Sequence, residues 1–438
     1  MGSVCLIGQV FLDTLRIRGK LRVRLGGIFH AARGLWAAEV QYQLCYLGPQ
    51  YLDGLVENEA ADLEVRAVHK FGNITHCPNV LLVDDEREVG AQHYEMLLEP
   101  EKRSELSADA LTESLDYIPD DVLIFPGAFD LGSLLERLKS ASARVHIDTT
   151  EGHIEPSTLA RLGRPVETLI TSTSTHLFLE QVGGSSTCLR EQFSGVARNI
   201  LLKENRGGSR LFTNDGDEIS VPAHTRKILH SVGVGDCFDA IYVSTVTTHS
   251  PLAALGYSSL IAAEYACRFD DGDSFKAATK AALGIDPAEV STLMGVSLPW
   301  EVRAKIEIYI AAPDFSTLYR PNIEAICSAL AYHNFTVHRP VQDNGEVPNS
   351  ASPEEKSRIG HLDADLIRRC RVLLAVLEYD DPGTYVEIGM AATLNIPVVV
   401  YDPHSLAQNL MVTSFATLVS ADRDVVLGEI YRIAESLR

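Results

Sequence analysis

The sequence predicts an α/β protein of two units, and three observations support this prediction. The chain of 438 residues is too long for one ordinary hydrophobic core. Short apolar runs alternate with helical stretches along its length, which is typical of a mostly parallel sheet. Residues 285–304 contain two prolines and no long apolar period, so they interrupt that alternation. We place the boundary at Pro299–Arg303, which gives units of residues 1–298 and 304–438.

Composition and charge exclude several classes of protein. A hydrophobic content of 46% with 22% charged residues indicates a globular chain. The net charge of −21 argues against nucleic acid or an anionic membrane as a partner, because both require a basic surface. It leaves room for a small molecule bearing phosphate, which needs only a local cluster of donors.

Cysteine usage and the amino terminus predict the compartment. The eight cysteines are scattered without a C-x-x-C pair, as expected of reduced thiols in a cytoplasmic protein. The apolar segment Val4–Ile7 follows directly on the start and lacks a basic flank, so we expect no signal peptide. No run approaches the roughly 18 apolar residues of a membrane helix.

The amino-terminal unit begins with a strand over Ser3–Val10, and Asp13 follows it. A polar, basic-alternating piece, Arg16–Arg24, comes next, then Gly26-Gly27 and a helical pattern over Ala31–Ala38. Further strands are predicted at Val80–Val83, Val122–Phe125, Val145–Asp148, Thr168–Ile170 and Asn199–Leu202.

The most informative stretch of this unit is KILHSVGVGDCFDA, residues 227–240. Gly233, Val234 and Gly235 form a flexible turn whose backbone N–H groups can point at an anion, and a helix follows. Asp236 lies at the mouth of that helix, where a carboxylate can accept a proton from an attacking hydroxyl during phosphoryl transfer. A glycine-rich turn with a capping aspartate explains the same pattern without any chemistry.

The first ~295 residues resemble ribokinase or PfkB-type sugar and nucleoside kinases. The resemblance depends on Asp13 after the first strand, on Gly26-Gly27, and on the late G-x-G-D from Gly233 to Asp236. It implies that Asp13, Gly26 and Gly27 bind the sugar. It also implies that residues 233–235 form the anion hole, that Asp236 is the catalytic base, and that ATP and Mg²⁺ are the cofactors.

Three departures from that family affect the implied kinase activity. The Asn that the family places after Gly-Gly is His30 or is absent, depending on a one-residue gap. The Asn-x-x-Glu motif should fall at Thr171–His176, where the sequence TSTSTH holds neither carboxylate nor amide. His230-Ser231 replaces the Asp-Thr before the glycine turn. A degenerate sugar-binding relative is therefore an alternative to an active kinase.

The carboxyl-terminal unit is predicted to be a small doubly wound, Rossmann-like domain. Its expected strands and helices are a strand at Ile306–Ala311, a helix at Tyr319–His333, a strand at Phe335–His338, an exposed loop at Gln342–Glu355, a helix at Ser357–Cys370 and strands at Val372–Leu377 and Pro397–Tyr401.

The stretch DDPGTYVEIGM, residues 380–390, lies between a buried strand and a helix of this unit. Asp380 to Gly383 break the strand and let the backbone turn closely. Glu387, three residues after Thr384, would then lie in the first turn of the helix, at the edge where open α/β sheets bind ligands. Thr-x-x-Glu is also a capping box, which gives Glu387 a purely structural explanation.

Several other side chains fall near the same edge. Tyr309 lies in the first strand, Phe315 in the loop after it, and Asp363 and Asp365 on the helix before the key strand; Asn409 follows the last predicted strand. Each has a structural explanation: a core tyrosine, loop packing, a solvated helix face, and a helix cap.

Together these residues resemble the nucleoside 2-deoxyribosyltransferases and their N-glycosidase relatives over nearly the whole unit. The matching landmarks are IYIAAPDF, an Asp before the penultimate strand, D-x-G-T-x-x-E-x-G, and a late Asn-Leu-Met. The resemblance implies that Glu387 attacks the anomeric carbon and that Tyr309 orients it. It implies that Asp381 and Asp363 contact and help to protonate the leaving base. We choose Asp363 over Asp365 because its spacing to the following strand fits better.

The remaining implied roles concern the substrate pocket. Phe315 would line it, Gly383 would let the backbone approach the substrate, and Asn409 would bind the 5′-hydroxyl, in its own or a neighbouring subunit's site. An oxocarbenium-like transition state needs a carboxylate on one face and an acid at the leaving group. We expect the helix N-terminus to keep Glu387 ionised.

The resulting hypothesis is a bifunctional cytoplasmic enzyme of nucleoside metabolism. Its carboxyl-terminal unit would cleave or exchange the N-glycosidic bond of a nucleoside, without a cofactor or metal, and its kinase-like unit would act on the sugar or nucleoside. We expect a homo-oligomer with small-molecule partners: a nucleoside or nucleobase and a sugar. The alternatives are a nucleoside-monophosphate N-glycosidase, which Asn409 disfavours, and a non-catalytic sugar or nucleotide sensor. A third possibility is that the amino-terminal unit is the enzyme and the carboxyl-terminal unit only a scaffold. The complete set of matching residues in the carboxyl-terminal unit argues against it.

Overall fold

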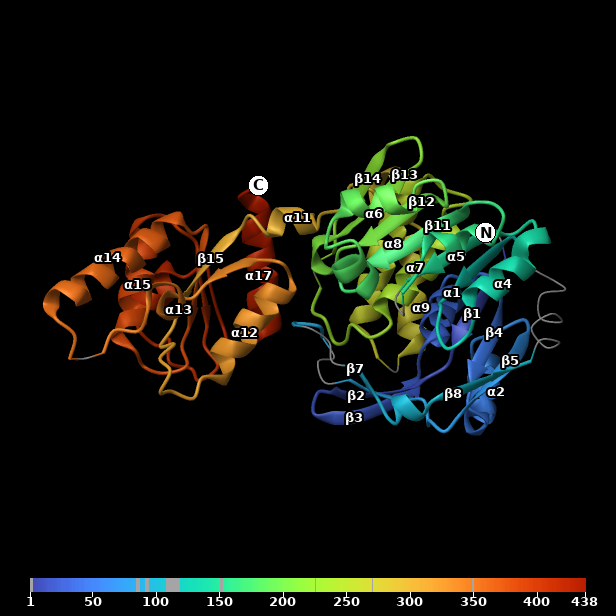
Figure 1. Ribbon diagram of the computed structural model, residues 1–438, viewed down its shortest axis with the longest axis horizontal. Helices are drawn as coiled ribbons and strands as arrows, with labels where there is room; N and C mark the ends of the chain where they lie inside the picture. Colours follow the sequence, from blue (N-terminus) through green and yellow to red (C-terminus); the bar gives the residue numbers. More distant parts are fainter. Residues whose placement is uncertain are drawn as a thin grey trace. The chain divides into compact units, whose positions relative to one another are not determined.

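The computed structural model describes residues 3–83, 87–90, 94–107, 119–149, 153–224, 226–269, 271–348 and 350–438. The chain divides into two compact units, shown in Figure 1. Unit 1 contains Met1–Glu88 and Gln92–Ser297, and unit 2 contains Val89–Ala91 and Leu298–Arg438.

Unit 1 contains a ten-stranded sheet in the order β14-β13-β12-β11-β10-β9-β1-β4-β5-β8. Its strands are β1 (Val4–Gln9), β4 (Tyr42–Gly48), β5 (Val68–Thr75), β8 (Arg103–Leu106), β9 (Asp121–Ile124), β10 (Arg144–Asp148), β11 (Val166–Ser172), β12 (Ala197–Lys203), β13 (Ser209–Thr213) and β14 (Glu218–Val221). The strands from β12 to β5 are parallel, and β13, β14 and β8 are antiparallel additions at the two ends.

Helices of unit 1 pack on this sheet. They are α1 (Ile28–Ala37), α2 (Asp53–Asp62), α4 (Leu131–Arg137), α5 (Pro156–Ala160), α6 (Ser186–Phe193), α7 (Val234–Thr245), α8 (Pro251–Ala266), α9 (Gly272–Leu283) and α10 (Pro287–Val290). The largest apolar core joins α1, α7 and α8 to β1 and β4, which brings the helix after Gly26-Gly27 against the helix after the G-x-G turn.

A separate four-stranded sheet of unit 1 has the order β3-β2-β6-β7. Its strands are β2 (Leu12–Ile17), β3 (Lys20–Leu25), β6 (Val80–Val83) and β7 (Tyr94–Met96). The polar segment Arg16–Arg24, for which we predicted no strand, forms most of the β2–β3 hairpin. Its turn is Arg18-Gly19, and both residues have positive φ, as hairpin turns of two residues require. Leu15 and Ile17 face a small core, and Arg16, Arg18 and Arg22 are exposed. Arg24 is partly buried and donates to the Val232 carbonyl at 3.1 Å.

Unit 2 is a five-stranded parallel sheet in the order β16-β15-β17-β18-β19. The strands are β15 (Glu307–Ala311), β16 (Thr336–His338), β17 (Val372–Val376), β18 (Val398–Tyr401) and β19 (Leu418–Ser420). The helices are α11 (Trp300–Arg303), α12 (Pro321–Tyr332), α13 (Pro340–Asn344), α14 (Pro353–Arg369), α15 (Pro382–Thr393), α16 (Leu410–Phe415) and α17 (Arg423–Ser436). In Figure 1, α14 and α15 cover one face of this sheet, and α12 and α17 cover the other.

The strand order places a topological switch point between β15 and β17, where chain connections leave in opposite directions. The predicted doubly wound fold is confirmed. The expected exposed loop at Gln342–Glu355 is only partly right, because α13 ends at Asn344 and α14 begins at Pro353. Each of those helices has a proline in its first turn, a strong start signal that the polar composition concealed.

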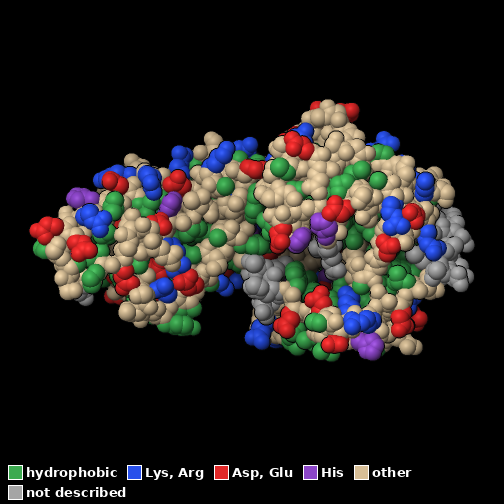
Figure 2. All heavy atoms as spheres, viewed as in Figure 1, with side chains coloured by type: hydrophobic (Ala, Val, Ile, Leu, Met, Phe, Trp, Pro, Cys, Tyr) green, Lys and Arg blue, Asp and Glu red, His purple; other side chains and the backbone are tan. Residues whose placement is uncertain are grey.

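The charge distribution and the helix lengths of the chain both bear on function. On the face shown in Figure 2, Asp and Glu side chains are interspersed with Lys and Arg. None of the helices that the structure describes combines the length and apolar character needed to cross a bilayer.

Candidate active site

Tyr309 and Glu387 meet on the face of the unit 2 sheet that α14 and α15 cover. The Tyr309 side chain on β15 is fully buried in that core. Its hydroxyl donates a hydrogen bond of 2.6 Å to Glu387 Oε1 on α15. A buried phenol thus fixes one carboxylate oxygen and leaves the second for other contacts.

The start of α15 corrects the expected capping box. The N-cap is Asp381, whose Oδ2 accepts hydrogen bonds from the Thr384 backbone N–H at 2.8 Å and the Thr384 hydroxyl at 2.9 Å. Thr384 is inside the helix, so Glu387 lies in the second turn and takes no part in capping. A Cβ on Gly383 would lie 3.1 Å from Asp381 Oδ2, so glycine suits this close approach.

Burial dominates the electrostatics of Glu387. Removal from water raises its pKa to about 7, although the Tyr309 hydrogen bond acts to lower it; the Asp363 and Asp381 charges raise it further. The expectation that the helix N-terminus keeps this group ionised is therefore wrong. Glu387 lies inside the helix, one turn after its N-terminus, and the effect of desolvation on its pKa outweighs that of the helix dipole. At neutral pH the carboxylate and the carboxylic acid are both populated.

Asp363 and Asp365 on α14 occupy different environments. Asp363 is partly buried, which raises its pKa, and its Oδ1 accepts a 2.8 Å hydrogen bond from Asn344 Nδ2. Asp365 is exposed and forms an ion pair with Arg368 at 2.6 Å. Of the two, only Asp363 is close enough to Glu387 to affect its pKa. Asn344 was not predicted, because it belongs to α13, which lies in the expected loop.

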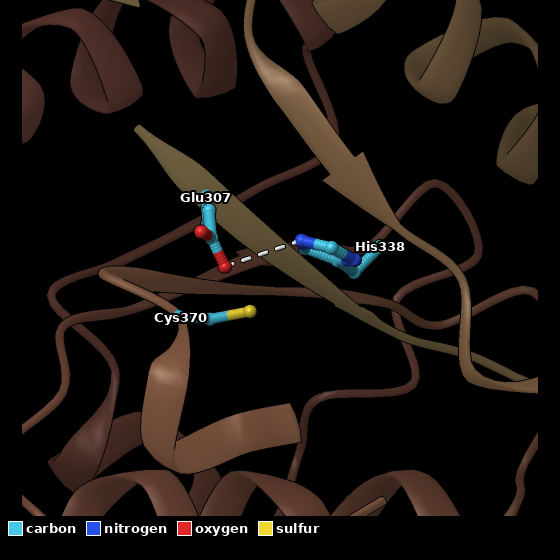
Figure 3. Close-up of side chains that lie close together, drawn as sticks. All are labelled: Glu307, His338 and Cys370. Atoms are coloured by element: carbon cyan, nitrogen blue, oxygen red, sulfur yellow. Dashed lines mark ion pairs between the residues drawn. The ribbon is translucent and has the colours of Figure 1, made fainter. Parts of the chain in front are cut away.

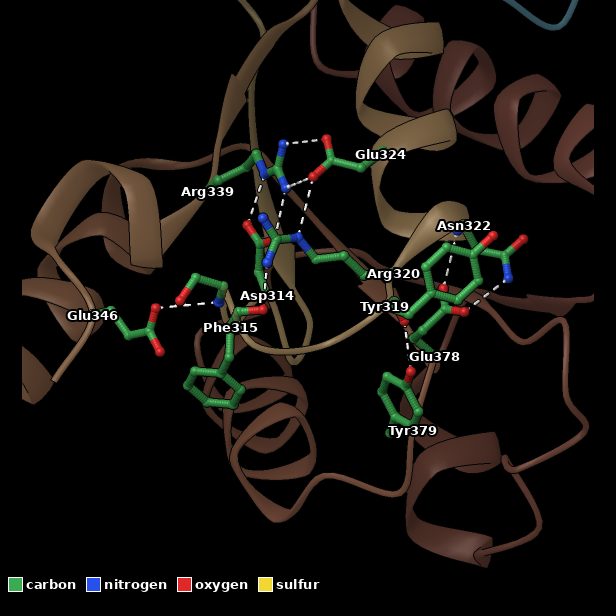
Figure 4. Close-up of polar contacts among 11 residues, drawn as sticks. Asp314, Phe315, Tyr319, Arg320, Asn322, Glu324, Arg339, Glu346, Glu378 and Tyr379 are labelled. Atoms are coloured by element: carbon green, nitrogen blue, oxygen red, sulfur yellow. Dashed lines mark hydrogen bonds and ion pairs between the residues drawn. The ribbon is translucent and has the colours of Figure 1, made fainter. Parts of the chain in front are cut away.

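Phe315 lies in the loop between β15 and α12, with 38% of its side chain exposed. An ion-pair network holds this loop (Figure 4). Arg339 donates to both oxygens of the buried Asp314, at 2.7 and 2.6 Å, and to both oxygens of Glu324, each at 2.8 Å. Arg320 pairs with Asp314 at 2.8 Å and donates to the Phe315 carbonyl. We call these four charged residues the loop clamp.

A second group of contacts ties the far end of the same loop to the end of β17. Glu378 lies two residues after the end of that strand. Its carboxylate accepts hydrogen bonds from the Asn322 backbone N–H and from Asn322 Nδ2, both at 3.1 Å. The Tyr401 hydroxyl donates to Asn322 Oδ1 at 3.1 Å. The Tyr379 hydroxyl donates to the Tyr319 carbonyl (Figure 4). Neither group has a local sequence signal, because its members come from separate elements.

The predicted site residue Asn409 lies at the start of α16. It is the exposed N-cap of α16 and accepts from the Met411 backbone N–H at 2.9 Å. It lines a cavity of about 830 Å³ along the flank of α15 that carries Tyr385 and Ile388. Glu387 is not among the described residues that line this cavity. Within one chain, Asn409 therefore has a helix-capping position.

In unit 1, the predicted sugar-binding and anion-hole residues adjoin. The buried Asp13 carboxylate accepts a 2.7 Å hydrogen bond from His30 Nε2. A Cβ on Gly26 would lie 2.2 Å from the Asp13 oxygens, and one on Gly233 would lie 2.0 Å from the His30 ring. Glycine is required at both positions because Asp13 and His30 occupy that space. Gly27 is the N-cap of α1 with φ of 62°.

With one placement of the one-residue gap, His30 stands where the family resemblance has an Asn after Gly-Gly; with the other placement, that Asn is absent. Burial lowers the pKa of His30 to about 4, against the raising effect of Asp13. Its Nδ1 lies 3.0 Å from the Tyr265 hydroxyl and 3.3 Å from Arg33 Nη1. A neutral His30 thus connects Tyr265 to Asp13, and the predicted sugar-binding carboxylate already has a protein partner.

The G-x-G turn begins α7. Gly233 is its N-cap with φ of 71°, Val234 and Gly235 are its first residues, and Asp236 lies in its first turn, partly exposed. A Cβ on Gly235 would lie 3.2 Å from Lys203 Nζ. The turn therefore offers backbone donors and a nearby ammonium group to an anion.

Lys203 was not predicted. It ends β12 and is held by two buried carboxylates, Asp148 Oδ2 at 2.8 Å and Asp239 Oδ2 at 2.7 Å. The two carboxylates engage the Lys203 ammonium, so a phosphate beside the turn would depend on the backbone N–H groups there. Magnesium fits less well, because the described residues 171–176 present hydroxyl groups, with Thr171 bonded to Thr149 and Thr175, and no carboxylate. We derive no kinase step from this site.

Comparison with known proteins agrees with both halves of the fold. The family model of nucleoside 2-deoxyribosyltransferases matches residues 308–421. Ribokinase from Arabidopsis thaliana, in complex with ribose and ATP, superposes with a TM-score of 0.50 at 16% identity, over 65% of this chain and 99% of that one. A protein from E. coli assigned as ribokinase II, in complex with ATP and Mg²⁺, gives 0.50 at 11% identity over 65% and 99%. No curated protein sequence matches the chain.

These similarities define the class. Unit 1 has a ribokinase-like fold, and residues 308–421 of unit 2 match the nucleoside 2-deoxyribosyltransferase family. The chain is a fusion of the two.

Proposed function

We propose that unit 2 cleaves or exchanges the N-glycosidic bond of a nucleoside, with Glu387 as nucleophile. The observation that carries this proposal is the 2.6 Å hydrogen bond from the buried Tyr309 hydroxyl to Glu387 Oε1. It holds a carboxylate at the carboxyl edge of the sheet, beside the switch point where such folds bind ligands. The family match over residues 308–421 supports the substrate class.

The proposed reaction has two steps. A Glu387 oxygen forms a bond to the anomeric carbon, the carbon–nitrogen bond breaks, and its electron pair stays on the base nitrogen, which takes a proton from Asp363. A second base or water then attacks the anomeric carbon and gives its proton to the Asp363 carboxylate, and Glu387 leaves as the carboxylate. The raised pKa of Asp363 suits a proton donor, because burial favours its protonated form.

The other predicted residues have supporting roles. Asp381 caps α15, and its unused oxygen Oδ1 would contact the leaving base. Phe315, held by the loop clamp, would cover the base, and Gly383 would leave room for it. Because Glu387 is not among the described residues that line the cavity beside Asn409, we propose that Asn409 binds the 5′-hydroxyl in a second copy of the chain, which requires a homo-oligomer. With Asn409 at this position, we expect a substrate whose 5′ end is unphosphorylated. Tighter binding of a nucleoside monophosphate than of its nucleoside would contradict this expectation.

The test is chromatography of free base from a panel of ribo- and 2′-deoxynucleosides, each with and without a second base. We expect release or exchange that Glu387→Ala abolishes and that Glu354→Ala, a change at an exposed glutamate of α14, leaves intact. Dependence on the second base separates a transferase from a hydrolase. Activity retained by Glu387→Ala would refute the proposal.

A second candidate function concerns unit 1, which we propose binds a sugar or nucleotide without turning it over. The observation that favours this function is the position of His30. Its Nε2 hydrogen-bonds to the Asp13 carboxylate, and its ring packs on Gly233. Calorimetric titration with ATP·Mg²⁺, followed by a phosphorylation assay over sugars and nucleosides, separates the two functions. Binding without turnover supports a sensor. Turnover that Asp236→Asn removes would instead establish a kinase, and turnover that survives Asp236→Asn would refute the role of Asp236.

A further inference from the structure

Three side chains with metal-binding atoms meet in unit 2, away from Glu387 (Figure 3). Glu307 begins β15, His338 ends β16, and Cys370 follows α14 directly. One ligand atom from each, a carboxylate oxygen, an imidazole nitrogen and a thiol sulfur, lie within 4.8 Å of one another. No local sequence pattern indicates this cluster, because its members are far apart in the chain.

The two ring nitrogens of His338 have different surroundings. Nδ1 lies 2.9 Å from Asp343 Oδ2, and an ionised carboxylate only accepts, so Nδ1 carries a proton. Nε2 is buried, has no hydrogen-bond partner among the residues that the structure describes, and lies 3.3 Å from Glu307 Oε2. Asp343 thus fixes the tautomer and the ring orientation that direct the Nε2 lone pair toward Glu307 and Cys370, as carboxylates do behind metal-bound histidines.

We propose that His338 Nε2, Cys370 Sγ and a Glu307 oxygen bind a divalent transition metal, with Zn²⁺ preferred and a water as fourth ligand. A set of one sulfur, one nitrogen and one oxygen suits the borderline-soft Zn²⁺ ion and not Mg²⁺ or Ca²⁺. Bonds of about 2.0–2.3 Å place tetrahedral ligand atoms about 3.3–3.8 Å apart, so the side chains need to close by only about 1 Å. The Cys370 proton passes to solvent when the metal binds.

The surroundings supply an entry path and a role. The Glu307 side chain is 41% exposed while Cys370 is buried, so the site opens to solvent on the carboxylate side. The metal would join β15, β16 and the end of α14. β15 carries Tyr309 and α14 carries Asp363. By holding these two elements, the metal would help to position both side chains in the proposed active site. The metal site itself does not depend on the proposed glycosidic activity.

The competing explanation is a doubly protonated His338 that bridges Asp343 and Glu307, with Cys370 a core thiol. Cobalt spectroscopy of the full-length protein distinguishes the two, because thiolate coordination gives a charge-transfer band and tetrahedral Co²⁺ gives intense visible bands. After purification in chelator and its removal, we expect one equivalent of Co²⁺ to produce both features and Zn²⁺ to displace them.

Variants assign the ligands. Cys370→Ser should abolish the charge-transfer band, and Cys327→Ser, at a buried cysteine of α12, should leave it unchanged. Asp343→Asn should weaken Co²⁺ binding about 10–100-fold, the usual effect of losing such a partner. Glu307→Gln changes a partly exposed group to one of the same size, so it tests the site even if Cys370→Ser does not fold. Absence of the thiolate band in the parent protein, or unchanged affinity in Glu307→Gln, would overturn the proposal.

Discussion

Tyr309 and Glu387 are 78 residues apart in the chain, yet the phenol of one donates a 2.6 Å hydrogen bond to the carboxylate of the other. The contact is possible because β15 and β17 are adjacent parallel strands and α15 follows β17 directly. It joins the two sides of the switch point in unit 2. Since the bond stabilises the ionised form of a carboxylate that burial disfavours, it sets the pH at which Glu387 can act as a nucleophile.

Glycosidic activity should rise with pH through about 7, because Glu387 must be ionised to attack and its pKa is raised to about 7. Tyr309→Phe removes a bond worth about 1.5–3 kcal/mol to a charged group, which would move this midpoint up by about 1–2 pH units. Initial rates of base release across pH measure the midpoint. A profile that stays in place while the rate falls would mean that Tyr309 contacts the substrate and does not tune Glu387.

Glu387 should also make the stability of unit 2 depend on pH. Its folded-state pKa is raised above the ordinary value, so its contribution is present at low pH and is lost as pH rises through about 7. Glu387→Gln should therefore stabilise unit 2 by about 1–3 kcal/mol above pH 7 and by little at pH 5. Urea unfolding followed by Trp300 fluorescence, in a Trp36→Phe background, measures this.

Glu354→Gln is the matched control for that experiment, because Glu354 is exposed on α14. We expect it to change unfolding by less than about 0.5 kcal/mol at every pH. Equal stability of Glu387→Gln and the parent protein at pH 8 would show that Glu387 is better solvated than its surroundings indicate.

The loop clamp should be a large contributor to the stability of unit 2. Arg339→Lys loses the paired donors to Asp314, a carboxylate only 3% exposed, and should destabilise the unit by about 2–4 kcal/mol. Arg368→Lys, at the exposed pair with Asp365, should cost less than about 0.5 kcal/mol. The same Trp300 unfolding assay compares them. Equal losses in the two variants would contradict the assigned importance of the clamp.

His30 should make unit 1 sensitive to acid. Its pKa is lowered to about 4 when folded and is near 6.5 when unfolded, so the unfolded chain binds more protons between these values. Stability should fall as pH drops from about 6.5 to 4, by up to about 1.4 kcal/mol per pH unit from this group. His30→Asn should flatten that slope, and His176→Asn, at a half-exposed histidine, should not.

Trp36 fluorescence in a Trp300→Phe background reports this unfolding. Asp13 and Tyr265 contact the His30 ring and Arg24 and Arg33 lie near it, so the variant changes their surroundings too. For this reason the slope of stability against pH is the informative quantity, and the absolute stability is not. A slope that His30→Asn leaves unchanged would refute the prediction.

Local patterns predicted the elements that carry most of the candidate residues. A short β-branched run followed by Asp-Asp-Pro-Gly predicted the β17–α15 turn, because strand propensity, chain breaking and helix initiation are all encoded within a few residues. The β2–β3 hairpin escaped prediction, because its exposed face carries charged residues and few of its side chains, such as Leu15, Ile17 and Leu25, reach a core. Its Arg18-Gly19 turn was the local signal that could have revealed it.

Local sequence patterns are enough to predict the two-unit α/β architecture, the turn that presents Glu387 and the G-x-G start of α7. The behaviour of these groups depends on the folded chain. The tertiary structure made Asp381 the cap in place of Thr384, raised the pKa of Glu387 to about 7, engaged Asp13 with His30, and brought Glu307, His338 and Cys370 together. The physical reason is that turns and periodicity depend on neighbours in the chain. Desolvation and charge–charge contacts depend on neighbours in space, which strand order alone brings together.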